Sequence, residues 1–259
     1  MARPSRTSRA LSQNFLTDQA AAERLARLAV PRHDPAPLVL EVGAGNGALT
    51  TRLAPRCRRL HAYEIDPRLV PALRARFADA GHVRILGGDF LTAHPPRTPF
   101  SVAGNVPFSR TADVVDWCLR APALTHATLL TQLEYARKRT GDYGSWTLLT
   151  VRSWPRHEWR LLARVGRHSF RPVPRVDAGI IRIERRATPL LDAGAYQGWR
   201  ELVELGFTGV GGSLHASLRR AYPRRRVDAA FRAARLDPSS LVGEVPPTGW
   251  LRLHAALTS

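Results

Sequence analysis

Short apolar runs alternate with amphipathic segments over the first half of this chain. The apolar runs predict buried strands at Leu38–Val42, Leu60–Ile65, Val83–Leu86, Phe100–Ala103 and Ala127–Thr131. Helical patterns precede or separate them, at Asp18–Ala29, Ala48–Ala54, Pro67–Ala80 and Thr111–Leu119. Strands that alternate with helices in this way predict an α/β fold, in which helices cover both faces of a parallel sheet.

The pattern changes after the fifth strand. Trp154–Arg164 and Ala178–Arg185 alternate without a helix between them, so we expect an antiparallel pair that closes the sheet. Beyond Thr188 and Pro189, glycines and prolines separate four helical stretches: Tyr196–Phe207, Ser213–Ala221, Val227–Arg235 and Gly249–Leu257. The expected organisation is a flexible arm over residues 1–12, an α/β domain over 13–188 and a small helical domain over 189–259.

The net charge of the chain gives information about its binding partner. The chain has 259 residues, 44% of them apolar, which is enough for one sizeable core, and a net charge of +18. All its lysine and arginine residues except Lys138 are arginine, which binds phosphate in a bidentate manner and stacks on bases. A GC-rich genome would explain arginine in place of lysine, but not the excess of positive charge, which indicates a polyanionic partner.

The arginines gather in two places. The arm carries three of them and no acid, and the segment Arg219–Arg235 carries seven arginines and one aspartate. Either set contacts RNA or forms a solvated face. The residues expected to bind RNA are Arg3, Arg6, Arg9, Arg219, Arg220, Arg224, Arg225 and Arg226.

Several classes of protein are disfavoured. Cys57 and Cys118 have neither metal-ligand spacing nor a disulfide framework, which favours a reducing cytoplasm. The basic N-terminus lacks the apolar stretch of a signal peptide, and no apolar run is long enough to span a membrane. We expect a cytoplasmic monomer with no metal.

A glycine-rich loop, Gly43-Ala44-Gly45-Asn46-Gly47, lies between a predicted strand and helix. Glycine permits positive φ and close approach of a ligand, and Glu64 ends the next strand, where an acid can bind ribose hydroxyls. The G-x-G-x-G spacing does not match the dinucleotide fingerprint. Asp89 follows the third strand, where it is placed to meet an adenine amino group. The glycine loop, Glu64 and Asp89 together therefore fit S-adenosylmethionine better than a dinucleotide.

The tetrad Asn105-Val106-Pro107-Phe108 follows the fourth strand and is the predicted catalytic motif. The amide oxygen of Asn105 and a main-chain carbonyl near Val106 can accept hydrogen bonds from an exocyclic amino group. Pro107 fixes the backbone and has no N–H, and Phe108 offers a flat face to a base. Since Gly43, Glu64, Asp89 and Asn105 follow successive strands, we expect them at one carboxyl edge of the sheet. The set indicates adenine N6-methylation of a nucleic acid.

These motifs resemble the Erm family of ribosomal RNA adenine N6-methyltransferases, within a wider group that includes the KsgA type. The resemblance runs from about Ser12 to about Arg186. It rests on Ser12-Gln13-Asn14-Phe15-Leu16, Glu41–Gly47, Glu64-Ile65-Asp66, Gly88-Asp89-Phe90, Asn105–Phe108 and Phe170–Asp177. It implies a Rossmann-like methyltransferase sheet, mostly parallel with an antiparallel closing strand, and a C-terminal helical domain.

The resemblance also implies roles for single residues. Gln13 and Asn14 would contact the methionine part of S-adenosylmethionine, Gly43 and Gly45 would lie beneath it, Glu64 would bind the ribose and Asp89 the adenine. Leu16, Ile65, Phe90 and Asn105 complete the expected cofactor set. Asn105 and Phe108 would hold the target base, and Phe170 would cap its other side unless it is a core aromatic.

By the same resemblance, the substrate would be one adenine in domain V of 23S rRNA, protein-free or in a precursor. Its methylation would confer resistance to macrolides, lincosamides and streptogramin B. A KsgA-type enzyme of small-subunit rRNA and a DNA adenine methyltransferase are alternatives. A non-catalytic RNA-binding or ribosome-assembly protein is a third, against which the intact Glu64, Asp89 and Asn105 argue.

Overall fold

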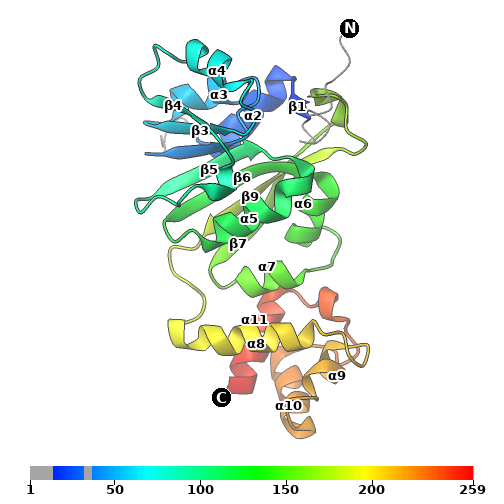
Figure 1. The fold of residues 1–259 in the computed structure, drawn as a ribbon. Coiled ribbons are helices and arrows are strands. Elements are labelled where there is room, and N and C mark those ends of the chain that lie inside the picture. Colours follow the sequence, from blue (N-terminus) through cyan, green and yellow to red (C-terminus); the bar gives the residue numbers. More distant parts are fainter. Residues whose placement is uncertain (1–13, 32–36, 259) are drawn as a thin grey trace. The chain divides into compact units, whose positions relative to one another are not determined.

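The computed structural model describes residues 14–31 and 37–258 of the chain. It divides into two compact units, each built from two stretches of sequence (Figure 1). Unit 1 comprises residues 1–136 and 160–185, and unit 2 comprises residues 137–159 and 186–259. The predicted basic arm, with Arg3, Arg6 and Arg9, lies outside the described residues, as does Gln13.

Unit 1 is built around a mixed sheet of seven strands in the order β4-β3-β2-β5-β6-β9-β7 (Figure 1). From β4 to β6 neighbouring strands are parallel, whereas β9 is antiparallel to β6. The strands are β2 Val39–Val42, β3 Leu60–Glu64, β4 Val83–Gly87, β5 Phe100–Asn105, β6 Leu124–Gln132, β7 His157–Val165 and β9 Ala178–Arg185. This confirms the predicted fold class and the antiparallel closure.

Helices cover both faces of this sheet. Consecutive residues of β5 are buried, which requires cover on each side of the strand. The main helices are α2 Gln19–Ala29, α3 Thr50–Leu53, α4 Val70–Arg76 and α5 Thr111–Arg120, with short 3-10 turns η1 Ala54–Arg56, η2 Phe90–Thr92, η3 Phe108–Arg110 and η4 Arg167–Ser169. Asp18 caps α2 by accepting hydrogen bonds from the backbone of Ala20 and Ala21, and Leu25 and Ala26 face the core.

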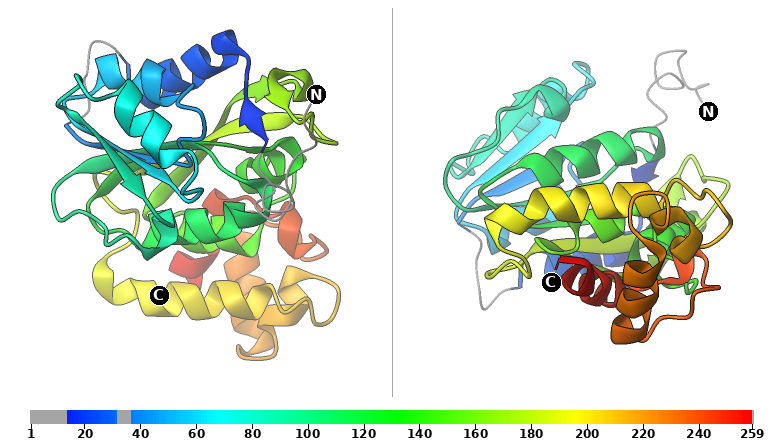
Figure 2. Two further views of the ribbon diagram at one scale, coloured as in Figure 1. Left: turned by 45° about the horizontal axis from the view of Figure 1, so that its top comes forward. Right: turned by 90° about the horizontal axis from the view of Figure 1, so that it is seen from below.

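A second, two-stranded sheet joins distant parts of unit 1. The strand β1, Phe15–Leu16, pairs antiparallel with β8, Phe170–Arg171, and the pair is visible beside the N-terminal helix (Figure 2). Leu16 is opposite Phe170 in the register. Both side chains are buried in the hydrophobic core of unit 1. The sequence pattern did not predict these strands, because each is two residues long.

Unit 2 is helical. Its helices are α7 Leu148–Ser153, α8 Tyr196–Gly206, α9 Leu214–Leu218, α10 Arg224–Ala234 and α11 Pro247–Thr258, with turns η5 Ala193–Ala195 and η6 Val242–Glu244. The helix α6, Leu133–Thr140, begins in unit 1 and ends in unit 2. The indoles of Trp199 and Trp250 are fully buried at the centre of unit 2, together with Phe231.

The division of the chain differs from the predicted boundary near residue 189. Residues 137–159 belong to unit 2, because Val151 of α7 lies in its core. In addition, the indole Nε1 of Trp199 donates a hydrogen bond of 3.0 Å to the main-chain oxygen of Arg152. Within the described ranges, no helix is both long enough and apolar enough to cross a bilayer.

Candidate active site

The predicted site residues of unit 1 meet at one edge of the sheet. Gly43 follows β2, Glu64 ends β3, Asp89 follows β4 and Asn105 ends β5. Since these four strands are parallel neighbours, their carboxyl ends share an edge, as the sequence predicts. Two adjoining cavities open there, and Gly43 and Pro107 line both.

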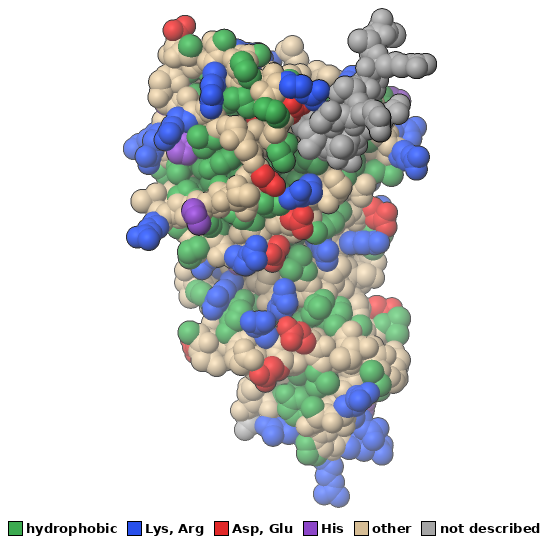
Figure 3. All heavy atoms as spheres, in the orientation of Figure 1, with side chains coloured by type: hydrophobic (Ala, Val, Ile, Leu, Met, Phe, Trp, Pro, Cys, Tyr) green, Lys and Arg blue, Asp and Glu red, His purple; other side chains and the backbone are tan. Residues whose placement is uncertain are grey.

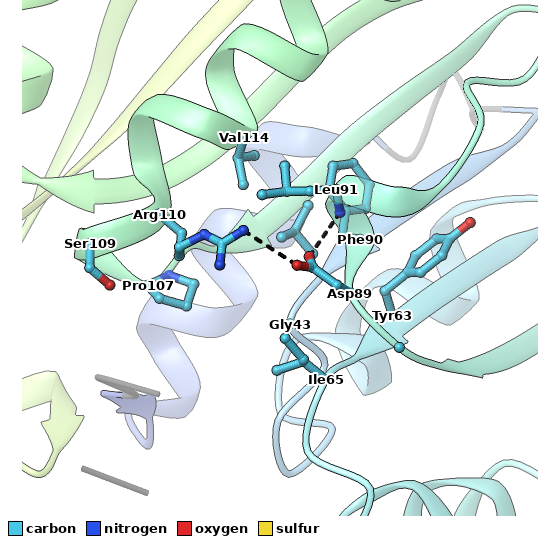
Figure 4. Close-up of a pocket in the computed structure, with 12 residues that line it drawn as sticks. Gly43, Tyr63, Ile65, Asp89, Phe90, Leu91, Pro107, Ser109, Arg110 and Val114 are labelled. Carbon is cyan, nitrogen blue, oxygen red and sulfur yellow. Dashed lines mark hydrogen bonds and ion pairs between the residues drawn. The ribbon is translucent and has the colours of Figure 1, made fainter. Parts of the chain in front are cut away.

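We call the two cavities the Asn105 cavity and the Asp89 cavity. The Asn105 cavity is lined by Asn14, Phe15, Gly43, Gly45, Glu64, Asn105, Val106, Pro107 and Phe108. The Asp89 cavity (Figure 4) is lined by Val42, Gly43, Tyr63, Ile65, Gly88, Asp89, Phe90, Leu91, Pro107, Ser109, Arg110 and Val114. The first therefore contains the tetrad and the glycine loop, and the second contains the acid of the third strand.

Glu64 holds the glycine loop in place. Its Oε2 accepts a hydrogen bond of 2.6 Å from the backbone N–H of Gly45, and its Oε1 accepts one of 2.8 Å from that of Asp66. The residue is only 1% exposed, yet it lines the Asn105 cavity. Gly43 and Gly45 have φ angles of 71° and 57°, which L side chains rarely adopt. The loop thus presents bare backbone to the cavity.

Asn105 is fixed by a contact with the N-terminal segment. Its Nδ2 donates a hydrogen bond of 2.7 Å to the main-chain oxygen of Asn14. The preceding Gly104 has no room for a side chain, since a Cβ there would lie 2.7 Å from the main-chain oxygen of Val42. Val106 is buried and donates its N–H to Leu130 of β6, whereas Phe108 is half-buried at the cavity wall.

In the Asp89 cavity, the carboxylate of Asp89 has two anchors (Figure 4). Oδ1 accepts a hydrogen bond of 2.9 Å from the backbone N–H of Leu91, and Oδ2 lies 3.3 Å from a terminal nitrogen of Arg110. Ile65 is 41% exposed and lines the same cavity. Phe90 also lines it, although its ring is mostly buried against Trp117, at a centroid distance of 4.5 Å.

The structure places two predicted site residues in the core of unit 1 and not at the cavities. Phe170 is fully buried there and does not line the Asn105 cavity, which disfavours its predicted role as a cap on the base. Leu16 is 4% exposed and lines neither cavity. The pairing of β1 with β8 directs both side chains inward. Phe170 is therefore the core aromatic that the sequence left as its alternative.

Sequence reasoning missed Arg110. Its position two residues after the tetrad and three residues before Asp113 is the signal that could have identified it. Its Nε lies 3.1 Å from Asp113, so the guanidinium joins two carboxylates.

Among the described residues, no group of histidine, cysteine and acidic side chains has the arrangement of a metal site. Cys57 and Cys118 are free and buried, and burial raises the pKa of the Cys57 thiol to about 12.

In unit 2, the predicted RNA-binding arginines lie on and before α10. Arg219, Arg220, Arg224, Arg225 and Arg226 are all exposed. Lys and Arg side chains gather over this end of unit 2 in Figure 3. Arg226 donates to the main-chain oxygen of Leu257 at 2.6 Å, and Arg224 lies 3.6 Å from Asp228. Arg219, Arg220 and Arg225 add further exposed positive charge to this surface.

Comparison with known proteins gives the family. The family model described as ribosomal RNA adenine dimethylase matches residues 5–259. The rRNA adenine N-6-methyltransferase of Streptomyces fradiae is 64% identical over 254 residues, 97% of this chain and 79% of that protein. The mycinamicin-resistance protein MyrB of Micromonospora griseorubida is 41% identical over 244 residues, 94% of this chain and 77% of that protein.

A solved structure agrees over the whole fold. The crystal structure of the 23S rRNA methyltransferase ErmE superposes with a TM-score of 0.90 at 48% identity, covering 95% of this chain and all of that one. The four strand ends with their glycine loop, acids and Asn-x-Pro-Phe tetrad thus occur on a shared architecture. The chain belongs to the ribosomal RNA adenine dimethylase family and, within it, to the Erm-type rRNA adenine N6-methyltransferases.

Proposed function

We propose that this protein transfers methyl groups from S-adenosylmethionine to N6 of one adenine in domain V of 23S rRNA, with dimethyladenine as the product. The observation that carries the proposal is the anchored amide of Asn105 beside the glycine loop. The modification would confer resistance to macrolides, lincosamides and streptogramin B. The names of the two similar proteins above, a 23S rRNA methyltransferase and a mycinamicin-resistance protein, support both the RNA and the phenotype.

The residues of the two cavities fit S-adenosylmethionine. Gly43 and Gly45, both at positive φ, line the Asn105 cavity with backbone that carries no side chain. The carboxylates of Glu64 and Asp89 are suitable acceptors for ribose hydroxyls and an adenine amino group. Asn14 would contact the methionine part, and Ile65 and Phe90 would supply apolar contacts to the adenine. When bound, the cofactor supplies an electrophilic methyl group on a sulfonium.

Asn105 would activate the target nitrogen. The N6 lone pair of adenine is delocalised into the ring, which makes the nitrogen a poor nucleophile. Because the Nδ2 of Asn105 is held by Asn14, its Oδ1 remains to accept a hydrogen bond from the N6 amino group. A main-chain carbonyl near Val106 would accept the second N6 hydrogen. Holding both hydrogens localises the lone pair on nitrogen, so the residues act by positioning and electrostatics.

Phe108 would hold the base itself. An adenine inside folded RNA must leave its stack before an enzyme can reach N6. The half-buried ring of Phe108 lies at the wall of the Asn105 cavity, where stacking would replace lost base contacts at about 1–3 kcal/mol. Pro107 keeps the backbone rigid between the ring and the amide.

The arginine surface of unit 2 would bind the phosphate backbone around the target. Arg219, Arg220 and Arg225 are exposed, and phosphate contacts fix orientation without reading sequence. Domain V is folded and buried in assembled large subunits. We therefore expect activity on protein-free 23S rRNA or early precursors in the cytoplasm, with one protein molecule acting alone.

A methylation map tests this function. Purified protein, S-adenosylmethionine and either protein-free 23S or 16S rRNA are incubated, and primer extension locates the modified base. One stop in domain V of 23S rRNA, absent with Asn105→Ala, is the expected result. Methylation confined to the 3′-terminal hairpin of 16S rRNA would establish the KsgA-type alternative. Absence of methylation on both RNAs, together with RNA binding, would indicate a non-catalytic protein.

A further inference from the structure

Arg110 lines the Asp89 cavity from the residue before α5, and its side chain points toward Asp89 (Figure 4). Its guanidinium lies between two acids: a terminal nitrogen is 3.3 Å from Asp89 Oδ2, and Nε is 3.1 Å from Asp113 Oδ2. The side chain makes no capping hydrogen bond to the backbone of α5. The guanidinium is therefore held between the carboxylate of Asp89, which lines the cavity, and that of Asp113 in the first turn of α5.

The two anchors of Asp89 leave it with spare acceptor capacity. Leu91 N–H occupies one position on Oδ1 and Arg110 one on Oδ2, whereas an ionised carboxylate offers about four acceptor sites. A ligand amino group can therefore bond to Asp89 while Arg110 stays in place. Opposite the arginine, Ile65 and Tyr63 form the other side of the cavity.

We propose that Arg110 is a positioning residue that makes the Asp89 cavity select a purine with a 6-amino group over one with a 6-oxo group. The proposal rests on the proposed function, because it takes the adenine of the cofactor to lie in this cavity. A guanidinium bonded to one oxygen of the carboxylate limits the rotation of that side chain and so fixes the direction in which its other acceptor positions point. An acceptor-only group bonds to an amino group and repels an oxo group.

Asp113 is the second part of this arrangement. It holds the arginine from the solvent side, and the side chains of Arg110 and Asp113 are 45% and 58% exposed. Exposed ion pairs are weak and screened by salt, so the effect on ligand affinity is modest. Without Asp113, the guanidinium spends less time against Asp89, and part of the selectivity is lost.

Calorimetry with two product analogues tests the proposal without RNA. S-adenosylhomocysteine carries the 6-amino group, and S-inosylhomocysteine carries a 6-oxo group in its place. For Arg110→Ala we expect the Kd for S-adenosylhomocysteine to rise about three- to tenfold, with a smaller change for S-inosylhomocysteine, so the preference falls. Asp113→Ala should give an intermediate loss, and Arg110→Lys should recover part of the preference.

Arg120→Ala is the matched control. Arg120 lies on the same helix and pairs with Asp116 at 3.0 Å, so the variant loses the same charge and a comparable surface ion pair. It should keep the wild-type affinities for both analogues. An Arg110→Ala protein that binds S-adenosylhomocysteine as tightly as wild type, or loses both analogues equally, would overturn the proposal. If Asp89→Ala also leaves both affinities unchanged, the cofactor assignment of the cavity fails with it; if Asp89→Ala weakens binding, only the role of Arg110 fails.

Discussion

The side-chain amide of Asn105 donates its hydrogen to the main-chain oxygen of Asn14, a residue 91 positions earlier, across 2.7 Å. This contact sets which end of the amide faces the Asn105 cavity. Asn105 thus has two separable properties: its Oδ1 can accept a hydrogen bond in the cavity, and its Nδ2 is held by Asn14. Substitutions can remove the two properties together or one at a time.

Asn105→Ala should abolish methyl transfer and leave cofactor affinity within a few-fold of wild type, because the residue acts on the nucleophile. Asn105→Asp keeps an acceptor oxygen but loses the donor to Asn14, so it should retain a small part of the activity. Single-turnover methylation and calorimetry measure the two quantities. Near-full turnover in Asn105→Ala would refute the assigned role.

Glu64 and Asp89 should differ in how they affect folding. Each alanine variant should lose about 1.5–3 kcal/mol of cofactor binding, the range for hydrogen bonds to charged groups. Glu64→Ala also leaves the buried N–H groups of Gly45 and Asp66 without this acceptor, so it should lower Tm. Asp89→Ala should lower Tm less, since that side chain is about one-third exposed, at 32%, and water can replace it at the N–H of Leu91. Calorimetry and thermal denaturation on both variants separate the effects.

Phe108 and Phe170 provide a matched pair of aromatic truncations. Phe108→Ala should reduce turnover strongly through a loss of about 1–3 kcal/mol in base stacking, with little change in stability. Phe170→Ala removes a fully buried ring and should cost about 3–5 kcal/mol in the free energy of unfolding. Urea denaturation and turnover at low temperature check both. A Phe170 variant with full stability and lost turnover would restore the base-capping role.

The arginines before and on α10 should act through salt-dependent RNA binding. Arg225→Ala removes an exposed guanidinium, so the plot of log affinity against log salt should become less steep by slightly under one unit. Arg200→Ala is the control within unit 2, because Arg200 lies 3.8 Å from Glu204 on α8. A slope in Arg225→Ala equal to that of wild type would show that Arg225 belongs to a solvated face.

Glu41 should make stability depend on pH. It is fully buried in β2, and this burial raises the pKa of its carboxyl to about 8. A pKa above the unfolded value means that the folded state binds more protons between about pH 4.5 and 8, so stability falls as pH rises through that window. Glu41→Gln should therefore match wild type near pH 4 and be more stable than wild type above pH 8 by several kcal/mol, with about 5 kcal/mol as the upper bound for a window of about 3.5 pH units. Equal urea midpoints of the two proteins at pH 8.5 would contradict this expectation.

The sequence predicted the sheet well because its central strands β2, β5, β6 and β9 are largely buried on both faces and read as continuous apolar runs. Phe100–Ala103 and Ala127–Thr131 lie inside β5 and β6, and Ala178–Arg185 matches β9 residue for residue. The strand ends then located Gly43, Glu64, Asp89 and Asn105. Their convergence follows from strand order, which the alternating pattern indicates.

The structural features that the sequence pattern could not predict depend on contacts between residues that are far apart in the chain. Leu16 pairs with Phe170 in strands of two residues, too short to show any periodicity. The helix α7 is six residues long and lies where the pattern predicted only a connection, before the expected strand Trp154–Arg164. Arg110 meets Asp89 only after β4 and β5 have taken their places in the sheet.

The two-segment composition of unit 2 has a consequence for dissecting the protein. Cutting the chain at residue 188 deletes α8 to α11 but keeps α7, whose Val151 would lose its buried surroundings. The remaining fragment would expose the apolar side chains of α7 to water and would therefore tend strongly to aggregate. A soluble catalytic fragment requires excision of α7 as well, with a short linker that leaves β7 intact. Conversely, the helical unit cannot be grafted onto another enzyme as a simple tail, because it is partly an insertion between strands.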